Sequence, residues 1–233
     1  MNLMPPPETE DIKELKRWCD ELYEFIKHPV FHTMEVGNVE GGNYTTFAND
    51  GELTQEGTAR VEKELAFSLD GIGKGSKAPT ITRLGNTIGW AFTVGDDGYM
   101  SFEIPPSWDS ATTIKIIIHI YINEAFATAD AATKWQATWS AVPEGRAGVG
   151  GTEPVDGATH TGTVTSANTP IPATAKCLQE ISLGSIAVAS LAEHDSVFLL
   201  ISRIAADTTD PTAEPVIVHA EYEWYADKLG EAT

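Results

Sequence analysis

The chain has 233 residues, 42% of them hydrophobic, and carries 34 acidic against 15 basic residues, a formal net charge of −19. This length suffices for one substantial core and a smaller appendage. The acidity argues against nucleic acid and anionic membranes as partners. The longest apolar run, residues 116–122, falls far short of the ~20 residues that cross a bilayer, and the first residues do not form a secretion signal. We therefore expect synthesis in the cytoplasm.

The two cysteines, Cys19 and Cys177, lie far apart in dissimilar segments. The chain has no CxxC pair and no ladder of cysteines and histidines at the spacing of a zinc site. We expect reduced thiols, no metal site and no cofactor.

The N-terminal segment predicts an extended arm followed by one amphipathic helix. Residues 1–10 contain three consecutive prolines, which favour an extended chain. A capping box at Asp11 and Glu14 opens a helical pattern that ends before Pro29. Apolar residues then recur at spacings of three and four, and two aromatic residues widen the stripe: Ile12, Leu15, Trp18, Cys19, Leu22, Phe25 and Ile26. So short a helix is marginal alone in water, so it must pack on the body of its own chain, on sister subunits or on a larger assembly. We expect this stripe, Cys19 apart, to contact other subunits or a shell.

Residues 30–60 are rich in Gly, Asn and Thr and predict a linker or extended arm, with a short strand at 31–36. Long irregular segments are uncommon inside compact domains and often lie along a neighbouring molecule. We divide the chain into residues 1–60, an arm, helix and linker, and residues 61–233, a β-sandwich.

Nine candidate strands follow, separated by turn-forming residues, and several of them show clear alternation. They are residues 61–69, 79–84, 88–94, 99–104, 113–122, 133–142, 176–183, 196–204 and 215–226. The clearest is residues 113–122, where Ile114, Ile116, Ile118, Ile120 and Ile122 share one face of an extended chain. In residues 215–226, Val216, Val218, Ala220, Tyr222 and Trp224 share one parity. The long polar stretch 143–174 predicts a loop or a marginal hairpin. The fold class is mainly β, an antiparallel sandwich.

Two glycine-rich or acidic loops resemble ligand sites but fit turns better. Residues 71–77, GIGKGSK, lack the Walker spacing and are not followed by a helix. Asp96-Asp97-Gly98 sits between two strand patterns, as a hairpin turn requires. Calcium is the weaker interpretation of these aspartates, because further oxygen ligands of an EF-type loop are missing.

Histidines and carboxylates in the strands give no catalytic signature. His119 and His219 each lie on the minority face of a strand, and His194-Asp195 precedes another, without a nucleophile elbow. Glu221 and Glu223 share one face, where carboxylates are ordinarily solvated, although glycosidases need such a pair. Tryptophans could line a sugar cleft, but core packing is the better interpretation for Trp90, Trp108, Trp135, Trp139 and Trp224. We expect no catalytic residue.

Three segments together resemble a known family: FTVGDDGYMSFEIPPSWDSATTIKIIIHIYI, SVFLLISRIAADTTD and VIVHAEYEWYADKLGEA. They are similar to the jelly-roll domains of tailed-bacteriophage structural proteins, which comprise capsid decoration or cement proteins and the head-proximal domains of fibres. The matching features are the turn at residues 101–109, the strand at 197–207 and the end at 221–230. The resemblance covers roughly residues 91–231 and does not extend to the N-terminal helix.

The resemblance implies a jelly roll and a homotrimer. On it we expect a non-enzymatic virion protein, made in the host cytoplasm, that binds the major capsid protein or other virion proteins and stabilises the head shell. A head-fibre, tail or baseplate protein is the alternative within this class. A carbohydrate-binding module on the same sandwich is the alternative from another class, and it should show coplanar exposed tryptophans beside paired carboxylates. Fold does not decide among these functions.

Overall fold

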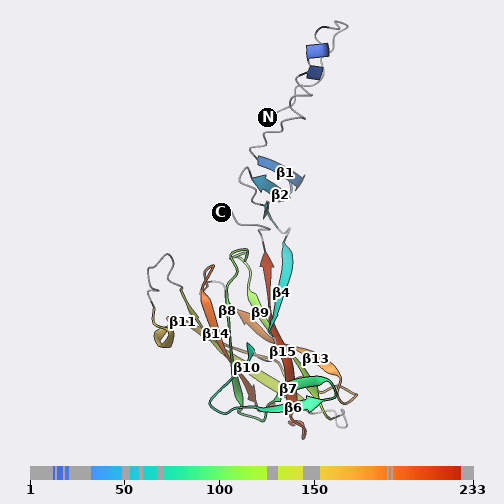
Figure 1. Cartoon of the computed structure of the whole chain (residues 1–233), viewed down its shortest axis with the longest axis vertical. Helices are drawn as coiled ribbons and strands as arrows, with labels where there is room; N and C mark the ends of the chain where they lie inside the picture. The colour runs from blue at the N-terminus through green and yellow to red at the C-terminus, as the bar shows by residue number, and fades with distance from the viewer. Residues whose placement is uncertain are drawn as a thin grey trace.

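A computed structural model describes residues 13, 15–17, 19–20, 33–48, 53–57, 60–67, 71–124, 131–143, 153–187, 189 and 191–226. Figure 1 shows an elongated molecule, with a small N-terminal sheet set along the long axis from a β-sandwich. The N-terminal sheet is β1 (Thr33–Asn38), β2 (Asn43–Ala48) and β3 (Leu53–Gln55). The sandwich is built from β4 (Val61–Phe67), β5 (Gly73–Lys74), β6 (Thr80–Leu84), β7 (Thr87–Ala91), β8 (Asp97–Glu103), β9 (Ile114–Ile122), β10 (Ala132–Val142), β11 (His160–Thr165), β12 (Thr169–Pro170), β13 (Leu178–Ile186), β14 (Ser196–Ile204) and β15 (Pro215–Ala226), with a 3-10 turn η2 (Val155–Gly157).

The sandwich strands form two antiparallel sheets with jelly-roll connectivity. The first sheet has the order β13-β9-β15-β7-β6, with β4 also paired to β15. The second has the order β11-β10-β14-β8-β5, with β12 paired to β10. The chain crosses between the sheets at nearly every step, so that β7-β15-β9-β13 faces β8-β14-β10-β11. This is the eight-stranded double Greek key, and the predicted fold class is confirmed.

The core lies between the two sheets and is built from the predicted alternation. Ile114, Ile116, Ile118, Ile120 and Ile122 of β9 are all buried, with at most 1% of each exposed. From the second sheet, Trp135 and Trp139 of β10 meet them in the same cluster. Each fully buried isoleucine contributes about 1.5–3 kcal/mol, so β9 is a major source of stability. All nine predicted strands are present.

A β-bulge in β15 overturns the predicted alternation of that strand. The pairing of β15 with β9 shifts register between Ile217 and His219. Ala220, Tyr222 and Trp224 therefore face the core as predicted, whereas Val216 and Val218 pack with Tyr121 and Ala91 in a separate outer cluster. A bulge inserts one residue into a strand and reverses the faces beyond it.

The segment from Asp96 to Gly98 is not the predicted hairpin turn, because β7 and β8 belong to different sheets. It is a corner where the chain passes between the sheets. Asp96 accepts hydrogen bonds from the backbone N–H and the hydroxyl of Thr93 at 2.6 and 2.8 Å. The buried Arg203 of β14 donates from Nη1 to the Phe92 carbonyl at 2.7 Å. These hydrogen bonds give partners to the Thr93 backbone and hydroxyl and to the Phe92 carbonyl at the corner. Burial of the Arg203 guanidinium lowers its pKa.

Two other predicted loops contain strands. Residues 71–77 contain the short strand β5, which pairs with β8, and Asp97 accepts hydrogen bonds from Ser76 and from the Lys77 backbone. Gly73–Lys74 therefore belong to the second sheet, where the sequence predicted only a turn. Within residues 143–174, β11 pairs antiparallel with β10, which confirms the hairpin interpretation for the described residues. Cys19 and Cys177 are free and exposed.

The N-terminal region contains more sheet than predicted. A strand at β1 confirms the expected one, but β2 and β3 complete a three-stranded antiparallel meander that the sequence pattern did not indicate. The described residues between 13 and 20 are helical and exposed. No helix in the described residues is long and apolar enough to cross a membrane.

Candidate functional site: two histidines and a glutamate on the outer face of the first sheet

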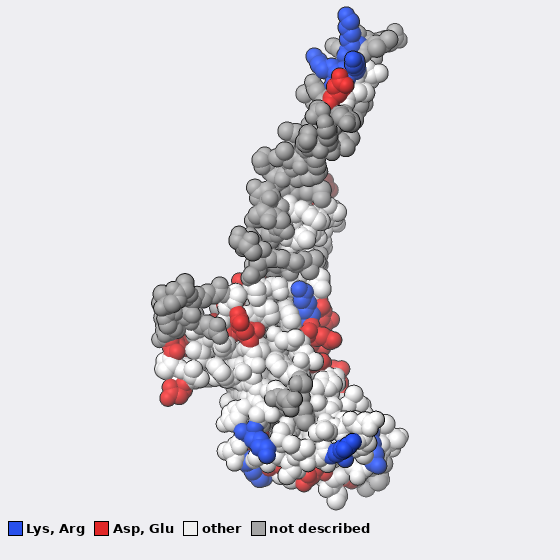
Figure 2. Space-filling view, in the orientation of Figure 1, with Lys and Arg blue, Asp and Glu red and all other residues white. Residues whose placement is uncertain are grey.

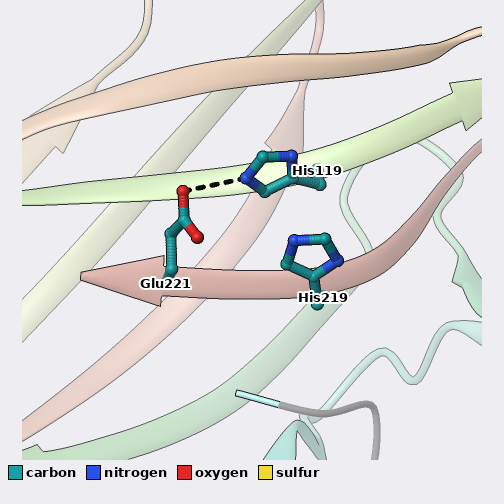
Figure 3. A group of neighbouring side chains, drawn as sticks. All are labelled: His119, His219 and Glu221. Atoms are coloured by element: carbon teal, nitrogen blue, oxygen red, sulfur yellow. Dashed lines mark hydrogen bonds and ion pairs between the residues drawn. The ribbon is translucent and has the colours of Figure 1, made fainter. Parts of the chain in front are cut away.

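Two histidines and a glutamate meet on the outer face of the first sheet. His119 of β9 and His219 of β15 are direct cross-strand partners, and the bulge places His219 outward. Their rings are stacked, with centroids 4.1 Å apart and planes inclined by 18°. Glu221 lies two residues further along β15 and its Oε1 is 2.9 Å from His119 Nε2. Figure 3 shows the carboxylate aimed at the His119 ring, with His219 on the same side of the two strands.

The three side chains are partly withdrawn from water. Glu221 is 7% exposed, although it lies on an outer face, and both histidines are half-buried. Burial and the neighbouring His119 ring lower the pKa of His219, and the Glu221 charge opposes this only partly. His219 is therefore held toward its neutral form, in which one ring nitrogen carries a lone pair.

Carboxylates extend the cluster along β15 toward β4. Glu223 faces the same side as Glu221, as the sequence predicted, and its Oε2 binds the Lys115 ammonium at 2.9 Å. This hydrogen bond raises the pKa of Lys115 against the opposing effect of burial. Glu64 of β4 lies opposite Glu223 in the pairing. Figure 2 shows acidic residues gathered along the β4 side of the sandwich, whereas much of the remaining visible surface carries no charge.

A groove of about 380 Å³ adjoins the histidine pair. Its wall is formed by His219, by three apolar side chains and by one threonine, one tyrosine and one lysine: Leu84, Leu178, Val218, Thr87, Tyr121 and Lys176. The groove gives a small ligand access to one side of His219. Its apolar lining and few polar groups are typical of small-molecule sites.

Sequence reasoning missed this cluster because its members are far apart in the chain. His119 and His219 are 100 positions apart, and pairing of β9 with β15 is what joins them. The signal that was available, both histidines on the minority face of a strand, is confirmed. The pairing partner and the bulge were not readable from local patterns. Among the described residues, one further group of side chains has its ligand atoms close enough together to hold a metal ion. It consists of Glu64, Glu221 and Glu223.

Most of the predicted contact stripe of the N-terminal helix cannot be placed. Ile12, Trp18, Leu22, Phe25 and Ile26 lie outside the described residues. Leu15 is described, and 45% of it is exposed. Its role as a contact residue stays a prediction.

The remaining candidate residues fall into structural roles. Trp90, Trp108, Trp135, Trp139 and Trp224 are all buried, so core packing is confirmed for each of them. None of these tryptophans offers the exposed platform expected of a sugar site. His194 lies on a turn and contacts Glu103 at 2.6 Å, while Asp195 accepts a hydrogen bond from the Ala192 backbone.

No family model and no curated protein matches the chain. Solved structures that are similar in outline include the CBM36-1 domain of a multidomain xylanase from the hindgut metagenome of Trinervitermes trinervoides, at 8% identity, covering 69% of this chain and 96% of that one with a TM-score of 0.34. The CBM2 module of the evolved Dit of Lactobacillus casei BL23 phage J-1 shares 5% identity over 72% of this chain and 97% of that one, with a TM-score of 0.32. The infectious bursal disease virus Gx strain structure shares 10% identity over 75% of this chain and 39% of that one, with a TM-score of 0.31. At these scores the likenesses carry no argument about function.

Proposed function

We propose that the protein is a virion structural protein of a tailed bacteriophage, a capsid decoration (cement) protein without enzymatic activity. In this proposal it acts as a homotrimer that binds the head shell through residues before about Arg60. The sequence resemblance to phage jelly-roll proteins supports the class. The observation that carries the role of the N-terminal region is the exposed apolar face of its small sheet.

Strand register defines that face. Val36 of β1 lies opposite Thr45, and Phe47 of β2 lies opposite Leu53 of β3, so Val36, Phe47 and Leu53 share one side of the sheet. Val36 is 51% exposed and Phe47 is 39% exposed. In the described residues, these three strands pair only with one another. A sheet this small needs a hydrophobic face packed against something for stability, and sister copies or a shell would supply it.

The test uses the full chain with single lysine substitutions on the two faces of the sheet. Val36→Lys or Phe47→Lys should reduce the mass measured by multi-angle light scattering from trimer to monomer and weaken binding to shells that lack the decoration protein. Thr46→Lys, on the opposite face, is the matched control and should leave both unchanged. A wild-type monomer at virion-like concentration would contradict the trimer. Unchanged shell binding by chains that lack residues 1–60 would exclude the arm as the anchor.

Carbohydrate binding is the second candidate, and Tyr99 is the observation in its favour. Tyr99 of β8 is 50% exposed on the outer face of the second sheet. Its cross-strand partner is Leu200, and Thr138 follows in the same row. An exposed tyrosine has an apolar ring face and a polar hydroxyl at its edge, and such a ring suits stacking on a sugar. Binding on a glycan array that is lost in Tyr99→Ala and kept in the surface control Tyr225→Ala would favour this function over shell binding. Location in purified virions, by peptide mass spectrometry of separated heads and tails, distinguishes a head protein from a fibre, tail or baseplate protein.

A further inference from the structure

We propose that His119, His219 and Glu221 form a binding site for a divalent first-row transition-metal ion, with zinc as the first candidate. This replaces the sequence-based expectation of no metal site, which rested on local spacing. One ligand atom from each residue lies within 4.8 Å of the others. The site is independent of the proposed virion function.

The ligand atoms lie within a small side-chain movement of the separations that a shared ion requires. Zinc binds imidazole nitrogen and carboxylate oxygen at about 2.0–2.2 Å, so two ligands on one tetrahedral ion lie roughly 3.3–3.6 Å apart. His119 Nε2 and Glu221 Oε1 are 2.9 Å apart. An ion bound by both atoms would lie to one side of the line that joins them, displace the proton of their hydrogen bond and move them apart by roughly 0.4–0.7 Å. The His219 ring is stacked on His119 at a centroid distance of 4.1 Å, and one of its nitrogens lies within 4.8 Å of the other two ligand atoms. Binding of the same ion by this nitrogen requires the ring to rotate out of the stack.

The supporting strands are rigid, which favours a defined geometry. β9 and β15 are interior strands of the first sheet, with partners on both sides. Their inner faces carry Ile118 and Ala220, paired directly and fully buried. The bulge that turns His219 outward is what aligns it with His119, so the fold itself assembles the ligands.

Charge around the cluster favours a cation. Glu223 and Glu64 continue the acidic row beyond Glu221, and Glu180 of β13 pairs with His119 from the other side. Lys115 is the facing cation, and Glu223 binds it. Two imidazoles and one carboxylate match the ligand preferences of zinc and similar ions, whereas calcium and magnesium prefer oxygen ligands throughout. Three protein ligands leave at least one position for water or a further ligand.

The test is metal binding by the tag-free full-length chain. Isothermal titration with ZnCl₂ at pH 7.5 should give one ion per chain, and zinc should raise the melting temperature by several degrees. His119→Gln, His219→Gln and Glu221→Gln should each weaken binding by about 10- to 100-fold or more, since even outer-shell partners of a metal matter by that factor. With Co²⁺ as a second probe, wild type should show a visible d–d absorption that the three variants lose.

The matched control is His194→Asn, which removes a histidine that contacts a glutamate elsewhere in the sandwich and suits the left-handed backbone at that position, φ 65°. It should bind zinc as wild type does. His219→Phe keeps a ring in the stack and separates loss of a ligand from loss of folding, which circular dichroism monitors. No zinc binding by folded wild type, preference for calcium, or affinity that is unchanged in all three ligand variants would each overturn the proposal.

Discussion

The ring of Tyr222 stacks on the ring of Phe102 across the sandwich, with centroids 4.0 Å apart and planes inclined by 15°. Tyr222 belongs to β15 of the first sheet and Phe102 to β8 of the second. Trp224 extends the stack at 5.0 Å from Tyr222. The two sheets are therefore joined by aromatic contacts at the end of the core nearest β4.

Burial of Tyr222 predicts a loss of stability at alkaline pH. Burial raises its pKa from 10.0 to about 12, so the folded state holds the phenol proton more tightly than the unfolded state. The stabilisation is complete below pH 10 and is lost as pH rises toward 12, in total about 2–3 kcal/mol. Urea unfolding of wild type and Tyr222→Phe at pH 9 and pH 11.5 measures this loss in the free energy of unfolding. The variant should lose less stability than wild type over this range. Equal losses in both would contradict the prediction, and Tyr99→Phe controls for an exposed tyrosine.

The lowered pKa of His219 predicts the opposite dependence at acidic pH. The unfolded chain takes up a proton near pH 6.5, whereas the folded state resists it because of burial and the adjacent His119. Stability should therefore fall as pH decreases from above 6.5 through the lower folded value. The charged groups that face the pair of histidines are unchanged in all samples. They are Glu180, Glu221, Glu223 and Lys115. Urea unfolding with EDTA at pH 7.5 and pH 5.5 should show a smaller loss for His219→Phe than for wild type, and identical losses would refute it.

The alternation of β9 predicts that its isoleucines cannot be shortened without cost. Ile118→Ala should lower the free energy of unfolding by ~2–5 kcal/mol, because it leaves a cavity in a packed core. Ile81→Ala is the control, since 62% of Ile81 is exposed, and it should change stability by well under 1 kcal/mol. Denaturant titration compares the two. Similar small effects at both positions would show that β9 is not the centre of the core.

The sequence was informative where a strand has one buried face and no interruption. β9 shows this, since five isoleucines at period two can be buried together only in an extended chain. The sequence was misleading at β15, where Val218 forms a bulge that no local pattern marks. It was also misleading at Asp96, where residues typical of a hairpin turn form the connection between the two sheets. β9 and β15 pair although His119 and His219 are 100 positions apart in the chain. Their meeting could therefore be predicted only from the topology of the sheet. Within the N-terminal meander, β2 and β3 were missed because NYTTFA lacks clear alternation and LTQ is only three residues long.

The contact between Arg60 and Asp109 connects the end of the N-terminal region to the sandwich, and we predict that it stabilises this joint. The Arg60 guanidinium donates to the Asp109 carboxylate and to the Gly57 carbonyl. The Asp109 side chain is 7% exposed, and its other oxygen accepts from the Ala111 backbone at 2.9 Å. Arg60→Gln leaves this carboxylate poorly compensated and should cost about 1–3 kcal/mol.

Thermal unfolding and amide hydrogen exchange over β4 measure the effect of this contact. Arg60→Gln should melt at a lower temperature and exchange faster in residues 61–67, whereas Arg83→Gln, which removes an exposed arginine bonded to the Gly85 carbonyl, should not. The double variant with Asp109→Asn decides the mechanism. If the lone carboxylate causes the loss, the double variant will be less destabilised than the sum of the single variants. Strict additivity would mean that the two side chains stabilise the joint separately.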